Sequence, residues 1–484
     1  MMDETARGIP EARHALETLA VLLGYPTRFA QDRSGAGPED VPVWVGRPLA
    51  APGQWACVIE VVGWEPWDPS SLALARFQGR PLPCPGGVVP MRREGVFPAA
   101  WLRSVGYLLG REEETADGRR DRWECYAGNF TRLGDLGVLE RPLVHDAASE
   151  LSRCIDEWNE RRSLSTARSP RWKSGARFAA VLSHDVDDLH YASIPEALRL
   201  LRRARSPGSY AFRRSLAQMG RGLRRLGAAD DPFWRFDAWA TEEEKNGFRS
   251  TWFVFPPRPE RPHELDPLYR LDDKLRYGGR KVAFREVLRD LAKRGFEIGL
   301  HASYESFRHA GRLRAEKEQI ERAVGVPLYG IRQHFLRFDL SATWAAQANA
   351  GFEYDSTLGY NEAIGFRAGI AAPFRPWNPA RGAPHQLLEL PLAVMDGVLF
   401  RTMGLDGAAA ARRAIGLLEA VEAAEGLAVL LWHPNGADAE HHPGWWDAYR
   451  EVLAHLRARS AWVATAGEIH SWWRERERAV LREA

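Results

Sequence analysis

The chain has 484 residues, of which 45% are hydrophobic, and its 66 Lys and Arg residues nearly balance its 64 Asp and Glu residues. This length exceeds one ordinary domain and supplies material for a large core, so we expect a globular protein of two domains. A net charge of +2 gives no electrostatic reason for nucleic-acid binding, and we expect no nucleic acid as a partner.

The four cysteines, Cys57, Cys84, Cys125 and Cys154, lie in the first third of the chain and form no Cys-x-x-Cys pair. Their spacing matches neither a zinc finger nor a disulfide scaffold, so buried free thiols are expected. No apolar segment approaches membrane-spanning length, and no secretory signal is evident. The sequence therefore predicts a cytoplasmic protein without a transmembrane segment.

Residues 1–165 are predicted to form a smaller α+β domain, for which no motif indicates a role. Short strands broken by Pro and Gly are expected between residues 41 and 63. The charge run from Arg111 to Arg122 is typical of a solvated loop. Residues 166–175 are polar, contain a proline and are predicted to be a linker. Apolar residues at helical spacing indicate helices at 14–25, 101–110 and 147–162.

From residue 176 to 484, short apolar runs alternate with longer amphipathic ones. This alternation predicts a parallel sheet, closed or nearly closed into a (β/α) barrel. The predicted strands are 178–183, 250–255, 296–300, 328–332, 352–355, 388–394, 427–432 and 461–464. The main predicted helices are 282–294, 311–324, 340–350, 406–425, 445–459 and 467–478.

One insertion after the first barrel strand, at residues 196–228, is strongly basic. It could face an anionic glycan or a phosphate-bearing lipid carrier, whereas a solvated helix face is the more common role of such a run. Both interpretations stay open. Its nine arginines are Arg199, Arg202, Arg203, Arg205, Arg213, Arg214, Arg221, Arg224 and Arg225.

Ionisable residues gather where the first barrel strand ends, at His184, Asp185, Asp187 and Asp188. Asp185 and Asp187 are two residues apart and so point to one side of an extended segment. Catalytic groups collect at the carboxyl ends of strands in α/β folds. A strand followed by an Asx turn and a helix cap would explain the same residues without any chemistry.

Four other strand ends also carry polar groups, and their agreement at one edge of a barrel favours a shared catalytic site. Imidazole and carboxylate groups are good ligands for zinc and similar ions. Taken singly, each group has an ordinary explanation such as a surface ion pair or a turn. The groups are His301 and Glu305 after strand 296–300, Arg332 and His334 after 328–332, Asp396 after 388–394, and His433 after 427–432.

Together these segments resemble the polysaccharide deacetylase family, the NodB-homology domain of carbohydrate esterase family four, over roughly residues 176–470. The acidic pair of the family's first motif resembles Asp185 and Asp187, and the arginine of its third motif resembles Arg332. The fourth motif supplies an aspartate, for which Asp396 is the best match.

The second and fifth motifs are matched by histidines. The fifth, a Leu-x-His at a strand end, resembles residues 431–433. The second, a histidine with a partner about one helical turn later, resembles His301 with Glu305, or with Ser306. In the family this partner is a second histidine, and the third motif has a proline where this chain has His334. The third metal ligand and the pocket wall are the features that these departures affect.

The resemblance implies a (β/α) barrel of the distorted seven- or eight-stranded NodB type and a metal-dependent deacetylase. Its substrate would be an N-acetyl or O-acetyl group on a sugar of a polysaccharide or glycan precursor. The implied metal is a divalent ion, zinc first with cobalt or manganese as alternatives, held by Asp187, His301 and Glu305. The implied catalytic residues are Asp185 as general base, Arg332 as the cation that keeps it ionised, His433 as general acid, and Asp396 as the group that orients His433. The expected substrate contacts are Tyr304, His334, Tyr360, Arg367 and Trp432.

Residues 351–360 and 365–369, with 108–114 and 141–144, also resemble a bacterial subgroup of these proteins that has an additional N-terminal domain. Two alternatives remain. One is a hydrolase of a non-carbohydrate C–N amide on the same fold, because fold does not fix substrate. The other is a non-catalytic carbohydrate-binding or scaffold protein, which Glu305 in place of a histidine would favour.

Overall fold

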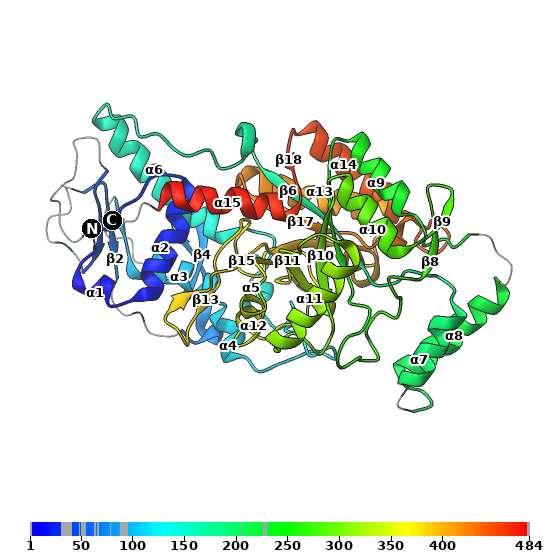
Figure 1. Cartoon of the computed structure of the whole chain (residues 1–484). Coiled ribbons are helices and arrows are strands. Elements are labelled where there is room, and N and C mark those ends of the chain that lie inside the picture. The colour runs from blue at the N-terminus through cyan, green and yellow to red at the C-terminus, as the bar shows by residue number, and fades with distance from the viewer. Residues whose placement is uncertain are drawn as a thin grey trace.

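A computed structural model describes residues 2–481 apart from 31–40, 48, 50–54, 62–63, 65–66, 78, 88–94, 205 and 226–229 (Figure 1). Arg205 and the end of the strand region expected before residue 63 lie outside the described residues. Within the described residues, no helix combines the length and the apolar character needed to cross a membrane.

The larger part of the molecule is built on one curled parallel sheet, in the strand order β15-β12-β11-β10-β7-β6-β17-β16. Its strands are buried on both faces, which explains why they are continuous apolar runs rather than alternating ones. The predicted (β/α) barrel is confirmed. The strands are β6 (Ala179–Val186), β7 (Thr251–Val254), β10 (Glu297–Ala302), β11 (Gly330–Gln333), β12 (Tyr354–Asp355), β15 (Leu388–Glu389), β16 (Leu392–Met395) and β17 (Leu427–Leu431), with β18 (Trp462–Val463) beside the start of β6.

A single broken segment closes this sheet. Strands β15 and β16 are separated only by Leu390 and Pro391, yet β15 pairs with β12 at one end of the sheet and β16 pairs with β17 at the other. Proline has no N–H to donate to a strand ladder, so Pro391 suits the point where the segment leaves one neighbour for the next. The sequence predicts one strand at 388–394, whereas the structure divides that segment between two partners.

Helices surround the sheet in the alternating order that the sequence predicts (Figure 1). Helix α15 begins with a capping box in which Thr465 and Glu468 satisfy each other's backbone N–H groups. The helices are α9 (Phe236–Lys245), α10 (Phe284–Lys293), α11 (Ala310–Val324), α12 (Thr343–Asn349), α13 (Gly407–Ala423), α14 (Trp445–Ala458) and α15 (Ala466–Val480). Two hairpins complete this part, β8 (Lys274–Tyr277) with β9 (Arg280–Ala283), and β13 (Trp377–Asn378) with β14 (Ala383–Pro384).

The N-terminal region contains a small parallel sheet in the order β1-β2-β5, one antiparallel hairpin, β3–β4, and helices at the three predicted places. All four cysteines are free and buried, as expected. The elements are α1 (Glu4–Arg7), α2 (Pro10–Leu23), β1 (Val43–Gly46), β2 (Cys57–Glu60), β3 (Leu72–Phe77), β4 (Arg80–Pro85), β5 (Val96–Phe97), α3 (Ala99–Gly110), α4 (Glu112–Ala116), α5 (Arg132–Asp135) and α6 (Leu143–Arg161).

This region shares buried surface with the barrel. Helix α15 packs against α2, and Trp172, within the predicted linker, is fully buried and donates from its indole to the Glu425 carbonyl at 2.7 Å. The charge run that we expect to be solvated begins instead with a buried ionic cluster. Glu114 accepts from Arg111 at 2.6 Å and from Arg367 of the barrel at 2.7 Å. Burial raises the pKa of Glu114, but Arg367 and Arg111 outweigh it and lower the pKa to about 2.

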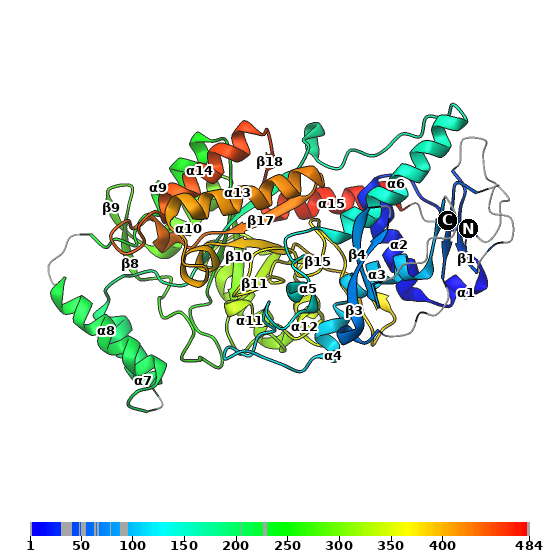
Figure 2. The ribbon, with the colours of Figure 1, turned by 180° about the vertical axis from the view of Figure 1, so that it is seen from behind.

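The basic insertion forms a helical hairpin, α7 (Ile194–Arg203) and α8 (Tyr210–Arg224). The two helices lie side by side and project from the barrel at the end of the molecule far from the N-terminal region (Figures 1 and 2). Each begins with a serine N-cap, at Ser193 and Ser209, as expected for helices that start in solvent-facing turns.

Candidate active site

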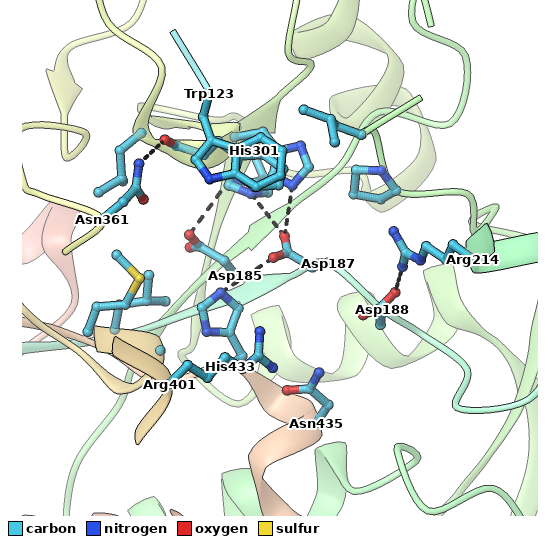
Figure 3. Close-up of a pocket in the computed structure, with 18 of the residues that line it drawn as sticks. Trp123, Asp185, Asp187, Asp188, Arg214, His301, Asn361, Arg401, His433 and Asn435 are labelled. Atoms are coloured by element: carbon cyan, nitrogen blue, oxygen red, sulfur yellow. Dashed lines mark hydrogen bonds and ion pairs between the residues drawn. The ribbon is translucent and has the colours of Figure 1, made fainter. Parts of the chain in front are cut away.

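A pocket of about 550 Å³ lies where the barrel strands end (Figure 3). Asp185 and Asp187 enter it from β6, His301 from β10, His334 from the end of β11, and His433 from the end of β17. The carboxyl ends of parallel strands meet at one edge of the barrel, so strand-end residues as distant in sequence as Asp185 and His433 share this pocket. The expected convergence of these strand ends is therefore what the structure shows.

Asp185 is held by a buried arginine. The Arg332 guanidinium donates to Asp185 Oδ1 and to Ser183 Oγ, both at 2.9 Å, and Arg332 is fully buried. Ser356 accepts from the other side of the guanidinium at 2.9 Å through its hydroxyl. The buried guanidinium therefore fixes the position of the Asp185 carboxylate and forms a charge-assisted hydrogen bond with it. Asp185 Oδ2 is left facing the pocket, 3.9 Å from His301 Nδ1.

His433 is oriented by Asp396, which is fully buried. Asp396 Oδ1 lies 2.7 Å from His433 Nδ1, and Asp396 Oδ2 accepts from the backbone N–H of His433 at 2.7 Å. This arrangement leaves His433 Nε2 directed at Asp187 Oδ2, 3.4 Å away. Burial alone would lower the pKa of His433, but the carboxylates of Asp396 and Asp187 hold that pKa well above its usual value.

Asp187, His301 and His334 form a compact group, in which one ligand atom from each residue lies within 4.8 Å of the others. His301 Nδ1 lies 3.2 Å from the Arg332 carbonyl, which can only accept, so neutral His301 presents the Nε2 lone pair to the pocket. His301 Nε2 is 3.1 Å and His334 Nε2 is 3.7 Å from Asp187 Oδ1.

The electrostatics of this group favour a cation. Asp187 Oδ1 is buried and has no hydrogen-bond partner among the described residues. Burial would raise the pKa of Asp187, but His334, His301 and His433 hold it well below its usual value. Burial lowers the pKa of His301, yet Asp185 and Asp187 outweigh it and raise that pKa. The same negative potential that favours a proton on His301 favours a metal ion, and a donor set of two imidazoles and one carboxylate fits zinc.

Glu305, the expected third ligand, lies outside this group. Its carboxylate accepts from Arg337 at 3.0 Å, and its side chain is 37% exposed. His334, expected as a substrate contact, lies in its place. Residues Phe335 and Leu336 then have φ of 59° and 52°, a rare backbone conformation for non-glycine residues that accompanies the turn after His334.

The other four expected substrate contacts lie in the core and do not line the pocket. Trp432 is fully buried, and its indole donates to the Trp445 carbonyl at 3.2 Å. Tyr360 is buried beside the guanidinium of Arg367, which pairs with the N-terminal region. The Tyr304 hydroxyl donates to the Trp123 carbonyl at 2.7 Å. These three aromatic residues are close to the site in sequence but are used here for packing.

The other two members of the first acidic cluster differ in position, because His184 lies away from the pocket whereas Asp188 lies on its wall. His184 is fully buried on the opposite side of β6, where its ring nitrogens lie 2.7 Å from Glu243 Oε1 and 2.7 Å from the Trp432 carbonyl. Asp188 pairs with Arg214 of α8. Strand alternation accounts for His184, since adjacent residues of a strand point to opposite faces.

The pocket wall includes residues that the sequence pattern does not assign to this site, together with Arg221 of the basic insertion. Trp123, from the end of the N-terminal charge run, packs on Phe335 with ring centroids 4.9 Å apart. Arg122, Arg221 and Arg401 also line the pocket, and within the described part of the chain none of them pairs with a carboxylate. A tryptophan after a run of charges is the one signal that could have indicated this wall.

No protein-family model matches the chain, and the comparison with curated proteins gave no match. A protein from Mycobacterium smegmatis described as a polysaccharide deacetylase is 22% identical over 63% of this chain and 93% of its own, with a TM-score of 0.43. Puue allantoinase is 16% identical over 64% of this chain and 95% of its own, with a TM-score of 0.42. The polysaccharide deacetylase Bc1974 from Bacillus cereus is 10% identical, covers 60% and 91% of the two chains, and has a TM-score of 0.29.

Proposed function

We propose that this protein is a metal-dependent hydrolase that removes an acetyl group from an N-acetylated, or O-acetylated, sugar of a glycan or glycan precursor. The observation that supports this most directly is the arrangement of Asp185 and His433 in one pocket beside the group of Asp187, His301 and His334. Amide hydrolysis near neutral pH needs a base that takes a proton from water and an acid that protonates the departing amine. In this pocket the base would be Asp185, paired with Arg332, and the acid would be His433, paired with Asp396.

The ligand group fits a divalent cation, with zinc first and cobalt or manganese as alternatives. When bound by Asp187, His301 and His334, such an ion would polarise the acetyl carbonyl and lower the pKa of a water molecule. Asp185 takes the proton of the attacking water, and the hydrogen bond from Arg332 holds the Asp185 carboxylate in position for this role. The C–N bond then breaks to give acetate and an amine.

His433 supplies the proton that the departing amine requires. Its Nδ1 proton is held by Asp396, so Nε2 carries the proton that is transferred. The high pKa of His433 keeps that proton available at neutral pH. For an O-acetyl substrate the same proton would go to the alkoxide. Each such transfer is typically worth about 100- to 10,000-fold in rate.

The pocket wall bears on the substrate class. Trp123 and Phe335 offer aromatic faces for a sugar ring, and three arginines add positive charge that is not neutralised locally. A glycan precursor that carries phosphate or carboxylate groups fits this wall better than a neutral oligosaccharide. We therefore place an acidic acetylated glycan or precursor first among the substrates.

The test measures acetate released from a panel of acetylated sugars by the full-length protein after reconstitution with zinc, cobalt or manganese. The panel pairs neutral chitooligosaccharides with UDP-N-acetylglucosamine. Asp185→Asn and His433→Ala should each lose about 100- to 10,000-fold in rate. Glu305→Gln, a matched loss of one carboxylate near the site, should retain activity. Metal content and circular dichroism confirm that the inactive variants remain folded and loaded.

Three results would contradict the proposal. Full activity in Asp185→Asn would remove its role as base. If the protein binds stoichiometric metal, releases no acetate from any sugar and hydrolyses a non-sugar amide, it is the alternative hydrolase of a non-carbohydrate C–N amide. Absence of both metal and activity would favour a non-catalytic protein.

A further inference from the structure

The α7–α8 hairpin carries an unusual concentration of exposed apolar side chains. Among the described residues, six large hydrophobic side chains are strongly exposed, and five of them lie on these two helices. Leu216 and Leu223 are the most exposed, at 57% and 56%. The five are Leu198, Leu201, Tyr210, Leu216 and Leu223, and the sixth is Tyr329, after α11.

The exposed leucines of α8 lie on one face of that helix. Leu216 and Leu223 are seven residues apart, and the partly exposed Phe212 and Met219 continue the same stripe at helical spacing. The opposite stripe of α8 faces the pocket. Arg214, Gln218 and Arg221, also at helical spacing, line the pocket.

The charge of the hairpin is almost entirely positive. Glu196 is the single acidic residue between residues 194 and 225, and it is buried. Arg202, Arg213 and Arg224 are exposed and, within the described part of the chain, form no ion pair with a carboxylate. The exposed surface of the hairpin therefore combines leucines with unneutralised arginines.

The exposed leucines beside these arginines are not what a solvated helix face requires, because such a face exposes polar and charged side chains and buries its leucines. A second copy of the chain is also disfavoured, since joining two hairpins would bring arginines together without acidic partners. Helices with Arg on one side and Leu or Phe on the other bind at the headgroup region of a bilayer, and each basic residue near an anionic leaflet adds about 1 kcal/mol.

We propose that the α7–α8 hairpin docks on an anionic membrane surface, with Leu198, Leu201, Leu216 and Leu223 entering the boundary between head groups and acyl chains. The exposed arginines contact lipid phosphates beside them. The hairpin projects away from the rest of the molecule, so it reaches a flat surface without hindrance from the barrel (Figures 1 and 2). This docking does not depend on the proposed deacetylation.

The test is co-sedimentation of the full-length protein with vesicles of phosphatidylcholine alone and of phosphatidylcholine mixed with phosphatidylglycerol. We expect binding to the mixed vesicles, weaker binding at high salt, and little binding to the neutral ones. The double variants Leu216→Ser with Leu223→Ser, and Arg213→Gln with Arg224→Gln, should each lose about ten-fold or more in affinity. Tyr329→Ser, which removes an exposed aromatic ring elsewhere, should bind as the wild type does.

Two further measurements separate docking from loss of structure. Arg213→Lys with Arg224→Lys keeps the charge and should restore most of the binding. An environment-sensitive dye on Leu216→Cys should shift to the blue with anionic vesicles, since the native cysteines are buried.

Three results would overturn the proposal. The first is equal or absent binding to both kinds of vesicle. The second is wild-type binding by the leucine double variant. The third is an oligomer, seen by light scattering, that the leucine double variant converts to monomers, because a second copy would then be the occupant of this face.

Discussion

At the scale of single residues, the site depends on where one histidine lies. His301 of β10 is paired in register with Arg332 of β11, and His334 follows two residues later on the same side of the chain. His334 thus reaches Asp187 from the neighbouring strand, whereas Glu305 is held away by Arg337. Two adjacent strand ends thus provide the two donors that accompany Asp187, whereas the motif assigns these two donors, as His301 and Glu305, to one loop.

This difference predicts a distinct pattern of metal content. His334→Ala should lose the metal ion, because it removes one of three donors, and Glu305→Ala should keep it. Plasma mass spectrometry of the purified variants, with His301→Ala as the positive control for loss, measures this directly. Loss of metal in Glu305→Ala but not in His334→Ala would show instead that Glu305 is the third metal ligand, as the family motif implies.

At the scale of elements, most of the barrel could be predicted because each buried strand and amphipathic helix has a local signature. The exceptions are set by tertiary contacts. Nothing local shows that the segment 388–395 changes partner at Pro391, or that Tyr360 and Trp432 turn into the core. Similarly, His184 and Asp185 belong to one predicted cluster, but adjacent residues of a strand point to opposite faces, so only Asp185 enters the site.

Helix α11 carries a buried carboxylate that should make stability depend on pH. Glu316 accepts hydrogen bonds from the backbone N–H and the hydroxyl of Ser303. Burial raises the pKa of Glu316 to about 7, against the opposing effect of Ser303. Because the folded protein holds this proton more tightly than the unfolded chain, stability is greatest below about pH 4.5 and falls as the pH rises through 7.

Glu316→Gln should remove this dependence. Between pH 5 and pH 8, the free energy of unfolding of the wild type should fall relative to that of the variant by about 2.5 kcal/mol. Urea unfolding of both proteins at several pH values measures the difference. If the free energy of unfolding depended on pH in the same way for both proteins, Glu316 would be ionised over the whole range from pH 5 to pH 8.

At the scale of the whole molecule, the N-terminal region and the barrel are joined by buried charge. Glu114 pairs with both Arg111 and Arg367, and all three side chains are buried. Glu114→Ala should destabilise the protein by about 3 to 5 kcal/mol, because it leaves two buried cations without a carboxylate. The double variant Glu114→Leu with Arg367→Met should be less destabilised than Glu114→Ala. Denaturant unfolding compares them.

The same region also contributes to the pocket. Trp123→Ala should raise KM for the acetylated substrate and change kcat little, because the tryptophan lies on the wall and apart from the reacting groups. Steady-state kinetics separate the two effects. An equal fall in kcat would show that Trp123 positions the acetyl group itself.

The closure of the sheet has a consequence for how the protein is made. Strand β6 is the first barrel strand in the chain, yet it pairs with β17 and β18, which are the last two. During synthesis, β6 must therefore wait until more than 240 further residues have left the ribosome before this side is covered. Pairings between strands so distant in sequence are slow to form. The early barrel strands therefore stay exposed as edges in the nascent chain and need protection from aggregation until the last strands pair with them.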